Sequence, residues 1–148
     1  MARIIALDVS NVRYTETAEL ARICSFQGSG AYLCSLMLDG SFSEYEKVFA
    51  AVEDDSVVGF CTLVKESCCE SDDEPWLDFL FVDERYRSRG IARMLVDTVC
   101  DYAKSLGFEQ IFLCTASHSG YYEKLGFSFV CQSEINENTM GTVMMKLL

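Results

Sequence analysis

The strongest fold signal in the sequence is the stretch Val82-Asp83-Glu84-Arg85-Tyr86-Arg87-Ser88-Arg89-Gly90-Ile91-Ala92. It follows an apolar run at 76–82 that predicts a central strand, and it leads into a helix that Gly107 ends as a C-cap. The helix is predicted by apolar residues that recur every three or four positions: Ala92, Leu95, Val96, Val99, Ala103 and Leu106. A turn that enters a long helix suits an anion, because the first N–H groups lack intrahelical acceptors and the helix dipole is positive there.

Three arginines, Arg85, Arg87 and Arg89, stand in this turn although the chain has a net charge of -11. Gly90 lets the backbone approach a ligand closely, and small Ala92 lets the helix pack close to its neighbours. The turn is therefore predicted to hold a phosphate group. Alternatively, Arg87 and Arg89 are solvated turn residues and Gly90 only eases a tight bend.

The remaining segments predict a mixed α/β sheet in a single domain over residues 1–148. Strands are expected at 3–7, 47–53, 56–65, 111–115, 127–132 and 142–147, and helices at 15–26, 31–38 and 120–125. Asp54 and Asp55 are typical of a hairpin turn between two of these strands. The polar segment 66–74 is expected to be an exposed loop.

The composition predicts a cytoplasmic protein with a real core. Of the 148 residues, 50% are hydrophobic, and there is neither a charged leader nor an apolar run of the roughly 20 residues that span a membrane. With 23 acidic and 12 basic residues, neither nucleic acid nor a membrane is an expected partner. The acidity weakly favours a cationic substrate such as an amine, although it can also serve solubility alone.

The eight cysteines do not predict a disulfide framework. Six of them, Cys24, Cys34, Cys61, Cys100, Cys114 and Cys131, fall in segments of predicted regular structure, where a thiol acts as a small hydrophobe. Cys68 and Cys69 are adjacent in the predicted loop. Without a CxxC pair and with one histidine, no metal site is expected, and reduced thiols indicate the cytosol.

Two motifs in this order carry a family resemblance. The first is Arg87-x-x-Gly90-x-Ala92, preceded by Phe81-Val82, and the second, later in the chain, is Tyr122-Glu123-Lys124-Leu125-Gly126-Phe127. With these two motifs the chain resembles the GNAT superfamily of acetyl-CoA-dependent N-acetyltransferases. The resemblance implies a mixed, mostly antiparallel sheet that is flanked by helices and splayed at its centre. The strands that carry Phe81 and Cys114 would separate there, and acetyl-CoA would be the cosubstrate.

The resemblance also implies roles for individual residues. Tyr122 would protonate the departing CoA thiolate, and the main chain of Phe81 and Val82 would pair with the pantetheine arm. Thr115 would also contact the cosubstrate. The pyrophosphate would be held by the backbone amides of Arg87, Ser88, Arg89, Gly90, Ile91 and Ala92.

The general base is open between two residues. Asp78 lies in an apolar strand, where desolvation would raise its pKa, but an outward-facing aspartate is about as compatible with the pattern. His118 could relay a proton through water or simply form a structural hydrogen bond. The turn at residues 115–119 contains His118, whereas many members of the family have an asparagine in this turn. Phe79 occupies a position at which some members have a second acidic residue.

Taken together, the sequence predicts an enzyme that moves an acetyl group from acetyl-CoA to a primary amine of a small molecule by direct attack in a ternary complex. Residues 31–45 should then close the acceptor groove. The alternatives are a protein or peptide acceptor, which predicts an open groove, and a non-catalytic acyl-CoA sensor. The C-terminal strand at 142–147 could pair between subunits of a homodimer.

Overall fold

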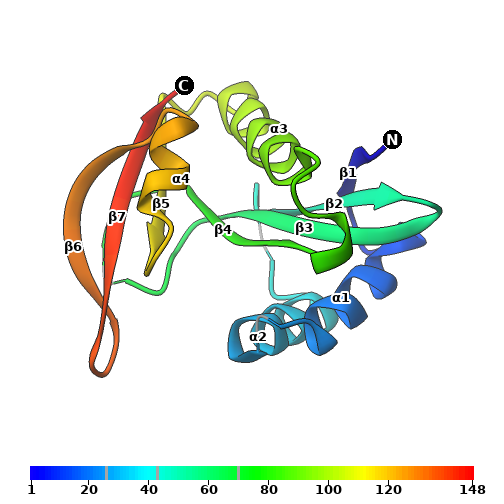
Figure 1. Ribbon diagram of the computed structural model, residues 1–148. Helices are drawn as coiled ribbons and strands as arrows, with labels where there is room; N and C mark the ends of the chain where they lie inside the picture. The colour runs from blue at the N-terminus through cyan, green and yellow to red at the C-terminus, as the bar shows by residue number, and fades with distance from the viewer. Residues whose placement is uncertain (26, 43, 70) are drawn as a thin grey trace.

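The computed structural model describes residues 1–25, 27–42, 44–69 and 71–148, and within them a seven-stranded open sheet has helices on both faces (Figure 1). The strands lie in the order β1 (Arg3–Leu7), β2 (Lys47–Glu53), β3 (Ser56–Val64), β4 (Trp76–Val82), β5 (Gln110–Thr115), β7 (Thr139–Leu147) and β6 (Ser128–Asn136). The helices are α1 (Arg13–Ile23), α2 (Gln27–Leu38), α3 (Ile91–Ser105) and α4 (Ser119–Lys124), with a 3-10 turn at Glu84–Tyr86. This is the predicted mixed α/β sheet.

The sheet splits at its centre, as predicted. β4 and β5 are parallel and pair at one register position, Trp76 opposite Phe112, whereas the neighbouring pairs are antiparallel ladders. The rings of these two residues lie 5.5 Å apart, and the amide of Phe112 donates to the carbonyl of Pro75 at 3.0 Å. Beyond this contact the strands diverge, which leaves the facing edge of β4 without a neighbouring strand.

Two apolar layers hold the elements together. On one face of the sheet α3 buries Leu95, Val96 and Val99 completely, and full burial of such side chains contributes roughly 1.5–3 kcal/mol each. α1 and α2 lie on the other face (Figure 1). They pack there in one cluster with Phe60 and Phe81, whose rings stack at 5.3 Å. The predicted apolar face of α3 is therefore correct, except that Leu106 is 43% exposed because the helix ends at Ser105 and Gly107, at φ 95°, turns the chain away.

Several predicted boundaries shift. The predicted helix 15–26 begins two residues earlier and ends at Ile23, and Phe26 lies outside the described residues. The second helix begins at Gln27, and β6 and β7 together extend the final hairpin to a turn at 137–138. Asp54 and Asp55 both have positive φ, 53° and 60°, which is the two-residue type I′ hairpin turn that their chemistry predicts.

Some expectations about the cysteines and the edge of the sheet are wrong. Cys24 caps the end of α1, Cys131 is exposed on β6, and Cys69 is buried against Trp76 although its loop was expected to be exposed. The eight cysteines, all of them in the described part of the chain, are free thiols. β7 lies between β5 and β6, so the C-terminal strand is not an edge that can pair with another subunit.

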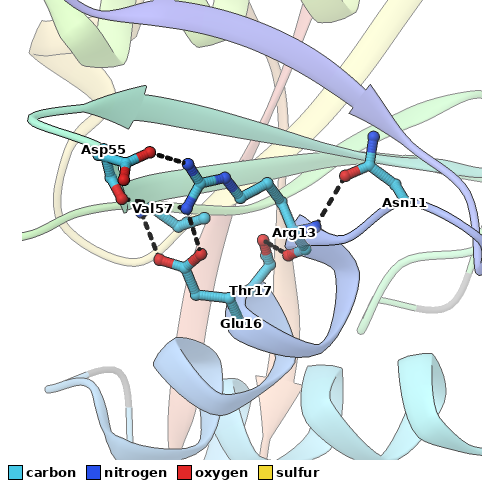
Figure 2. A network of polar contacts seen from close by, with 6 residues as sticks. All are labelled: Asn11, Arg13, Glu16, Thr17, Asp55 and Val57. Carbon is cyan, nitrogen blue, oxygen red and sulfur yellow. Dashed lines mark hydrogen bonds and ion pairs between the residues drawn. The ribbon is translucent and has the colours of Figure 1, made fainter.

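The start of α1 is tied to the β2–β3 hairpin by a polar network (Figure 2). The Arg13 guanidinium contacts Glu16 at 2.7 Å and the Asp55 carboxylate at 2.5 Å. The other carboxylate oxygen of Glu16 accepts a 2.7 Å hydrogen bond from the amide of Val57. This network fixes the helical layer that covers one wall of the site. None of the helices in the described residues has the length and apolar character of a membrane span.

Candidate active site

The split between β4 and β5 opens a cavity of about 980 Å³. Its walls come from β4, the turn before α3, the end of β5 and α4. This volume falls in the range of small-molecule and cofactor sites. Its lining includes the following residues predicted to bind the cosubstrate: Phe81, Val82, Arg87, Ser88, Gly90, Ile91, Ala92 and Thr115.

The turn before α3 presents main-chain donors to this cavity. The first helical hydrogen bond runs from Met94 to the carbonyl of Gly90, and within the described residues no group accepts from the amides of residues 88–92. Ser88 and Gly90 have positive φ, 64° and 82°, which turns successive amides toward one side. The arrangement therefore fits a diphosphate, whose oxygens would satisfy these donors. The amide of Arg87, in contrast, already donates weakly to Glu84 at 3.4 Å.

The three arginines of the turn have different surroundings. Arg87 lines the cleft, with its guanidinium 5.7 Å from the centre of the Phe81 ring. Arg85 pairs with Asp83 at 3.2 Å and is 81% exposed. Arg89 pairs with Glu53 at 3.2 Å and lies over the Tyr86 ring, and it is not among the residues that line the cleft.

The ladder between β3 and β4 decides which backbone groups face the cleft. The amide of Asp83 donates a 2.7 Å hydrogen bond to the carbonyl of Val58. Two residues earlier on β4, Phe81 lies opposite Phe60, which is the next hydrogen-bonded position of the same ladder. Since hydrogen-bonded and non-hydrogen-bonded pairs alternate, the main chain of Phe81 faces β3 and that of Val82 faces the cleft. Of the two residues predicted to pair with pantetheine, the register therefore favours Val82.

A second cavity, about 610 Å³, adjoins the first on the side of α2. It is lined by aromatic residues Tyr32, Phe42 and Phe79 and by the carboxylates of Glu46, Glu66 and Asp78. Lys65 is the one basic residue in this lining among those described. The two cavities share six residues: Ser29, Cys68, Asp78, Phe79, Ile135 and Asn136.

Asp78 lies where the two cavities meet. β4 carries a bulge there, because the register with β3 shifts between Phe60 and Thr62 and Phe79 adopts a φ of 54°. The amide of Phe79 donates to Asp78 Oδ1 at 2.9 Å. Burial raises the pKa of Asp78 to about 6, as the apolar strand predicts, and the hydrogen bond from Phe79 opposes this rise. A carboxylate with this pKa is mostly ionised at neutral pH and can accept a proton.

Tyr122 faces the same cleft from α4. Its ring packs edge-on against Tyr121 and Phe127, at 5.4 and 5.9 Å between centroids. Burial raises the pKa of its phenol, with smaller contributions from Cys61, Tyr121 and Asp78. The phenol is therefore kept protonated at neutral pH, which is the state that a proton donor needs.

His118 and Thr115 serve the turn between β5 and α4. The amide of His118 donates to Thr115 Oγ1 at 3.0 Å, and its Nδ1 lies 3.2 Å from Ser117 Oγ. The His118 side chain is exposed, although it lines the larger cavity. The main chain of His118 thus helps to form this turn, while its ring lies at the edge of the cleft.

Sequence reasoning pointed to residues 31–45 as a segment beside the acceptor groove, but it singled out none of the individual residues that line the second cavity. Ser29 and Tyr32 come from α2, and Ile135 and Asn136 come from the end of β6, and none of them belongs to a recognisable motif. Within the described residues no group of histidine, cysteine and acidic side chains is arranged to hold a metal ion.

An open α/β sheet that splits beside an anion-binding turn is the architecture of the acyl-CoA N-acyltransferase fold. The acetyltransferase (GNAT) family matches residues 15–127, and the chain belongs to this family.

Similar proteins agree with this assignment. Human N-acetyltransferase 8B is 40% identical over 58 residues, a match that spans 36% of this chain and about a quarter, 26%, of that protein. The Enterococcus faecium aminoglycoside 6'-N-acetyltransferase structure superimposes with a TM-score of 0.79 at 20% identity, over 98% of this chain and 96% of that one. An aminoglycoside 6'-N-acetyltransferase in complex with coenzyme A gives a TM-score of 0.78, with the same identity and coverage. At these identities the structural likeness concerns the fold.

Proposed function

We propose that the protein is an N-acetyltransferase that moves the acetyl group of acetyl-CoA to a primary amine of a small molecule. The observation that carries this proposal is the position of Asp78, where the cleft beside the anion-binding turn meets the second cavity. One cavity would hold the thioester and the other the amine. Direct attack in a ternary complex then needs no covalent enzyme intermediate.

Asp78 acts as the general base in this proposal. It takes a proton from the ammonium or the attacking amine, so that the nitrogen lone pair can form a bond to the thioester carbonyl carbon. With a pKa of about 6, Asp78 is ionised at neutral pH yet more basic than an ordinary aspartate. His118, exposed at the edge of the cleft, is assigned at most a relay through water.

Tyr122 acts as the general acid. As the carbon–sulfur bond breaks, its phenol donates a proton to the leaving sulfur. The main chain of Val82 binds the pantetheine arm, and the amides of residues 88–92 hold the pyrophosphate. These main-chain contacts bring the thioester to the junction at Asp78, so they orient the reaction as well as supply affinity.

The second cavity supports a small acceptor rather than a protein. α2 contributes Ser29, Tyr32 and Leu36 to its wall, and Ser41 and Phe42 continue it, which supports a groove that residues 31–45 help to close. Its three carboxylates against one lysine favour a cationic ligand, since an amine arrives protonated. A compartment that keeps thiols reduced, such as the cytoplasm, fits the eight free cysteines.

Two measurements test the proposal. Calorimetry should detect binding of coenzyme A, and a thiol-release assay should detect turnover of acetyl-CoA with members of a panel of amines, amino acids and peptides. The panel distinguishes small amines from peptide acceptors. Binding of coenzyme A without thiol release for any panel member would indicate an acyl-CoA sensor, and no binding at all would overturn the assignment of the turn.

A further inference from the structure

Ile135 is the extra residue of a β-bulge near the tip of the β6–β7 hairpin. Glu134 opposes Met140 and Asn136 opposes Thr139, so the register shifts by one residue across Ile135. A bulge re-aims a side chain relative to the regular alternation of the strand. Ile135 is half-buried, whereas Glu134 and Asn136 on either side are exposed.

Gly141 on β7 makes room for this side chain. A Cβ atom on Gly141 would lie 2.4 Å from Ile135 Cδ1, 2.6 Å from Ile135 Cγ1 and 2.7 Å from Cys114 Sγ. All three distances are shorter than real Cβ contacts allow. Gly141 is not among the glycines with positive φ, so the absence of a side chain is what matters at this position. The side chains of Ile135 and Cys114 therefore both occupy the space beside Gly141 that a larger residue would fill.

This places Ile135 beside the proposed reaction centre. It is one of the six residues that line both cavities, together with Asp78 and Phe79. An amine that occupies the second cavity can meet a thioester in the first only at this junction. The carbon atom that carries the amine must then lie against the residues of the junction, and Ile135 is the aliphatic one among them.

We propose that Ile135, seated on Gly141, sets how bulky the acceptor can be at the carbon that carries the amine. Amines on an unbranched methylene carbon are accepted, and amines on a branched carbon are rejected by contact with Ile135. Gly141 is a positioning residue, because it acts only by leaving space for the side chain of Ile135. The inference rests on the proposed acetyltransferase function.

The test compares 2-phenylethylamine with its α-methyl analogue, and propylamine with isopropylamine, as acceptors in the thiol-release assay. Each further amine that the panel identifies is paired with its own α-methyl analogue. We expect the unaltered protein to favour the unbranched partner by about 10-fold or more in kcat/KM, since one misplaced methyl group costs this much in a packed site. Ile135→Ala should reduce that preference by about 10-fold.

Gly141→Ala probes the positioning role. The added methyl group should push Ile135 into the junction and raise the acceptor KM by about 10-fold, with the KM for acetyl-CoA changed less than about twofold. The double variant Gly141→Ala with Ile135→Ala should regain the acceptor KM. Val130→Ala is the control, because Val130 lies on the same strand, is 43% exposed and lines neither cavity.

The outcomes separate the two proposals. A folded Ile135→Ala variant whose preference for unbranched amines equals that of the unaltered protein overturns the role of Ile135. A Gly141→Ala variant that loses kcat, or that the second substitution does not rescue, shows a purely structural role for Gly141. If coenzyme A does not bind or no amine is acetylated, the proposed function fails, and this inference fails with it.

Discussion

The Nε atom of Arg87 donates a 2.8 Å hydrogen bond to the main-chain oxygen of Val82, which ties the end of β4 to the turn that enters α3. Val82 is the residue whose main chain faces the split in the sheet. This one contact therefore links the proposed pantetheine-binding edge to the proposed pyrophosphate-binding turn. It also leaves the amide of Val82 as the group that can pair with the cosubstrate.

Arg87→Ala should weaken binding of coenzyme A by about 10-fold, because a positive charge leaves the cleft and the contact that holds the end of β4 to the turn is lost. Calorimetry measures this change. Arg85→Ala is the matched control, since Arg85 is exposed, pairs with Asp83 and does not line the cleft. Equal losses in both variants would mean that general charge, rather than this contact, attracts the ligand.

Tyr122→Phe should lower kcat by about 100-fold and leave the affinity for coenzyme A unchanged, because it removes the proton donor and keeps the packed ring. Single-turnover thiol release and calorimetry give the two quantities. Tyr121→Phe serves as the control on the neighbouring position, where the side chain is 39% exposed. A Tyr122→Phe variant that keeps full turnover would show that Tyr122 is not the proton donor.

The activity should depend on the ionisation of Asp78. Because a base must be deprotonated, kcat/KM should rise with pH through about pH 6 and then level off. Asp78→Asn should lose this limb of the profile together with about 100-fold in rate. A profile with the same limb in the variant would assign the base to another group.

The same residue should limit stability. Its folded-state pKa of about 6 lies above the ordinary value of 3.8, so the native state binds more protons than the unfolded state between these values. The free energy of unfolding therefore falls as the pH rises from about 4 to about 6, and the destabilisation by ionised Asp78 is fully present above pH 6. Asp78→Asn should raise the free energy of unfolding at pH 7.5 by about 2 kcal/mol, with the gain shrinking toward pH 4, since an amide oxygen can still accept from Phe79. Urea unfolding at several pH values checks the sign.

Glu16→Ala should lower the free energy of unfolding by about 1.5 kcal/mol, because it leaves the amide of Val57 and the Arg13 guanidinium without their shared partner (Figure 2). Glu19→Ala is the control on the same helix. Glu19 pairs with Arg22 on the exposed surface, where an ion pair contributes little, and urea unfolding should show no resolvable change. If both variants unfold alike, the network in Figure 2 does not hold α1 to the hairpin.

Local signals account for what the sequence by itself determined. Four features depend only on residues that are neighbours in the chain, so the local sequence predicts them directly. They are the apolar period of α3, its end at Gly107, the hairpin turn at Asp54 and Asp55, and the turn from Val82 to Ala92. The apolar strand indicated that burial could raise the pKa of Asp78, but only the tertiary structure decided this against an outward-facing side chain. These features were enough to predict the fold and the position of the turn that lines the larger cavity.

The tertiary structure alone decided which side chains line the second cavity. Tyr32, Glu66 and Ile135 come from a helix, a loop and a hairpin far apart in the sequence, and they meet only because the sheet brings their elements to the same end of the split. The bulge at Ile135 and the space above Gly141 depend on the register between two strands, and a shift of one residue would turn each side chain to the other face. Register is a property of paired strands, so neither strand's own sequence could reveal it.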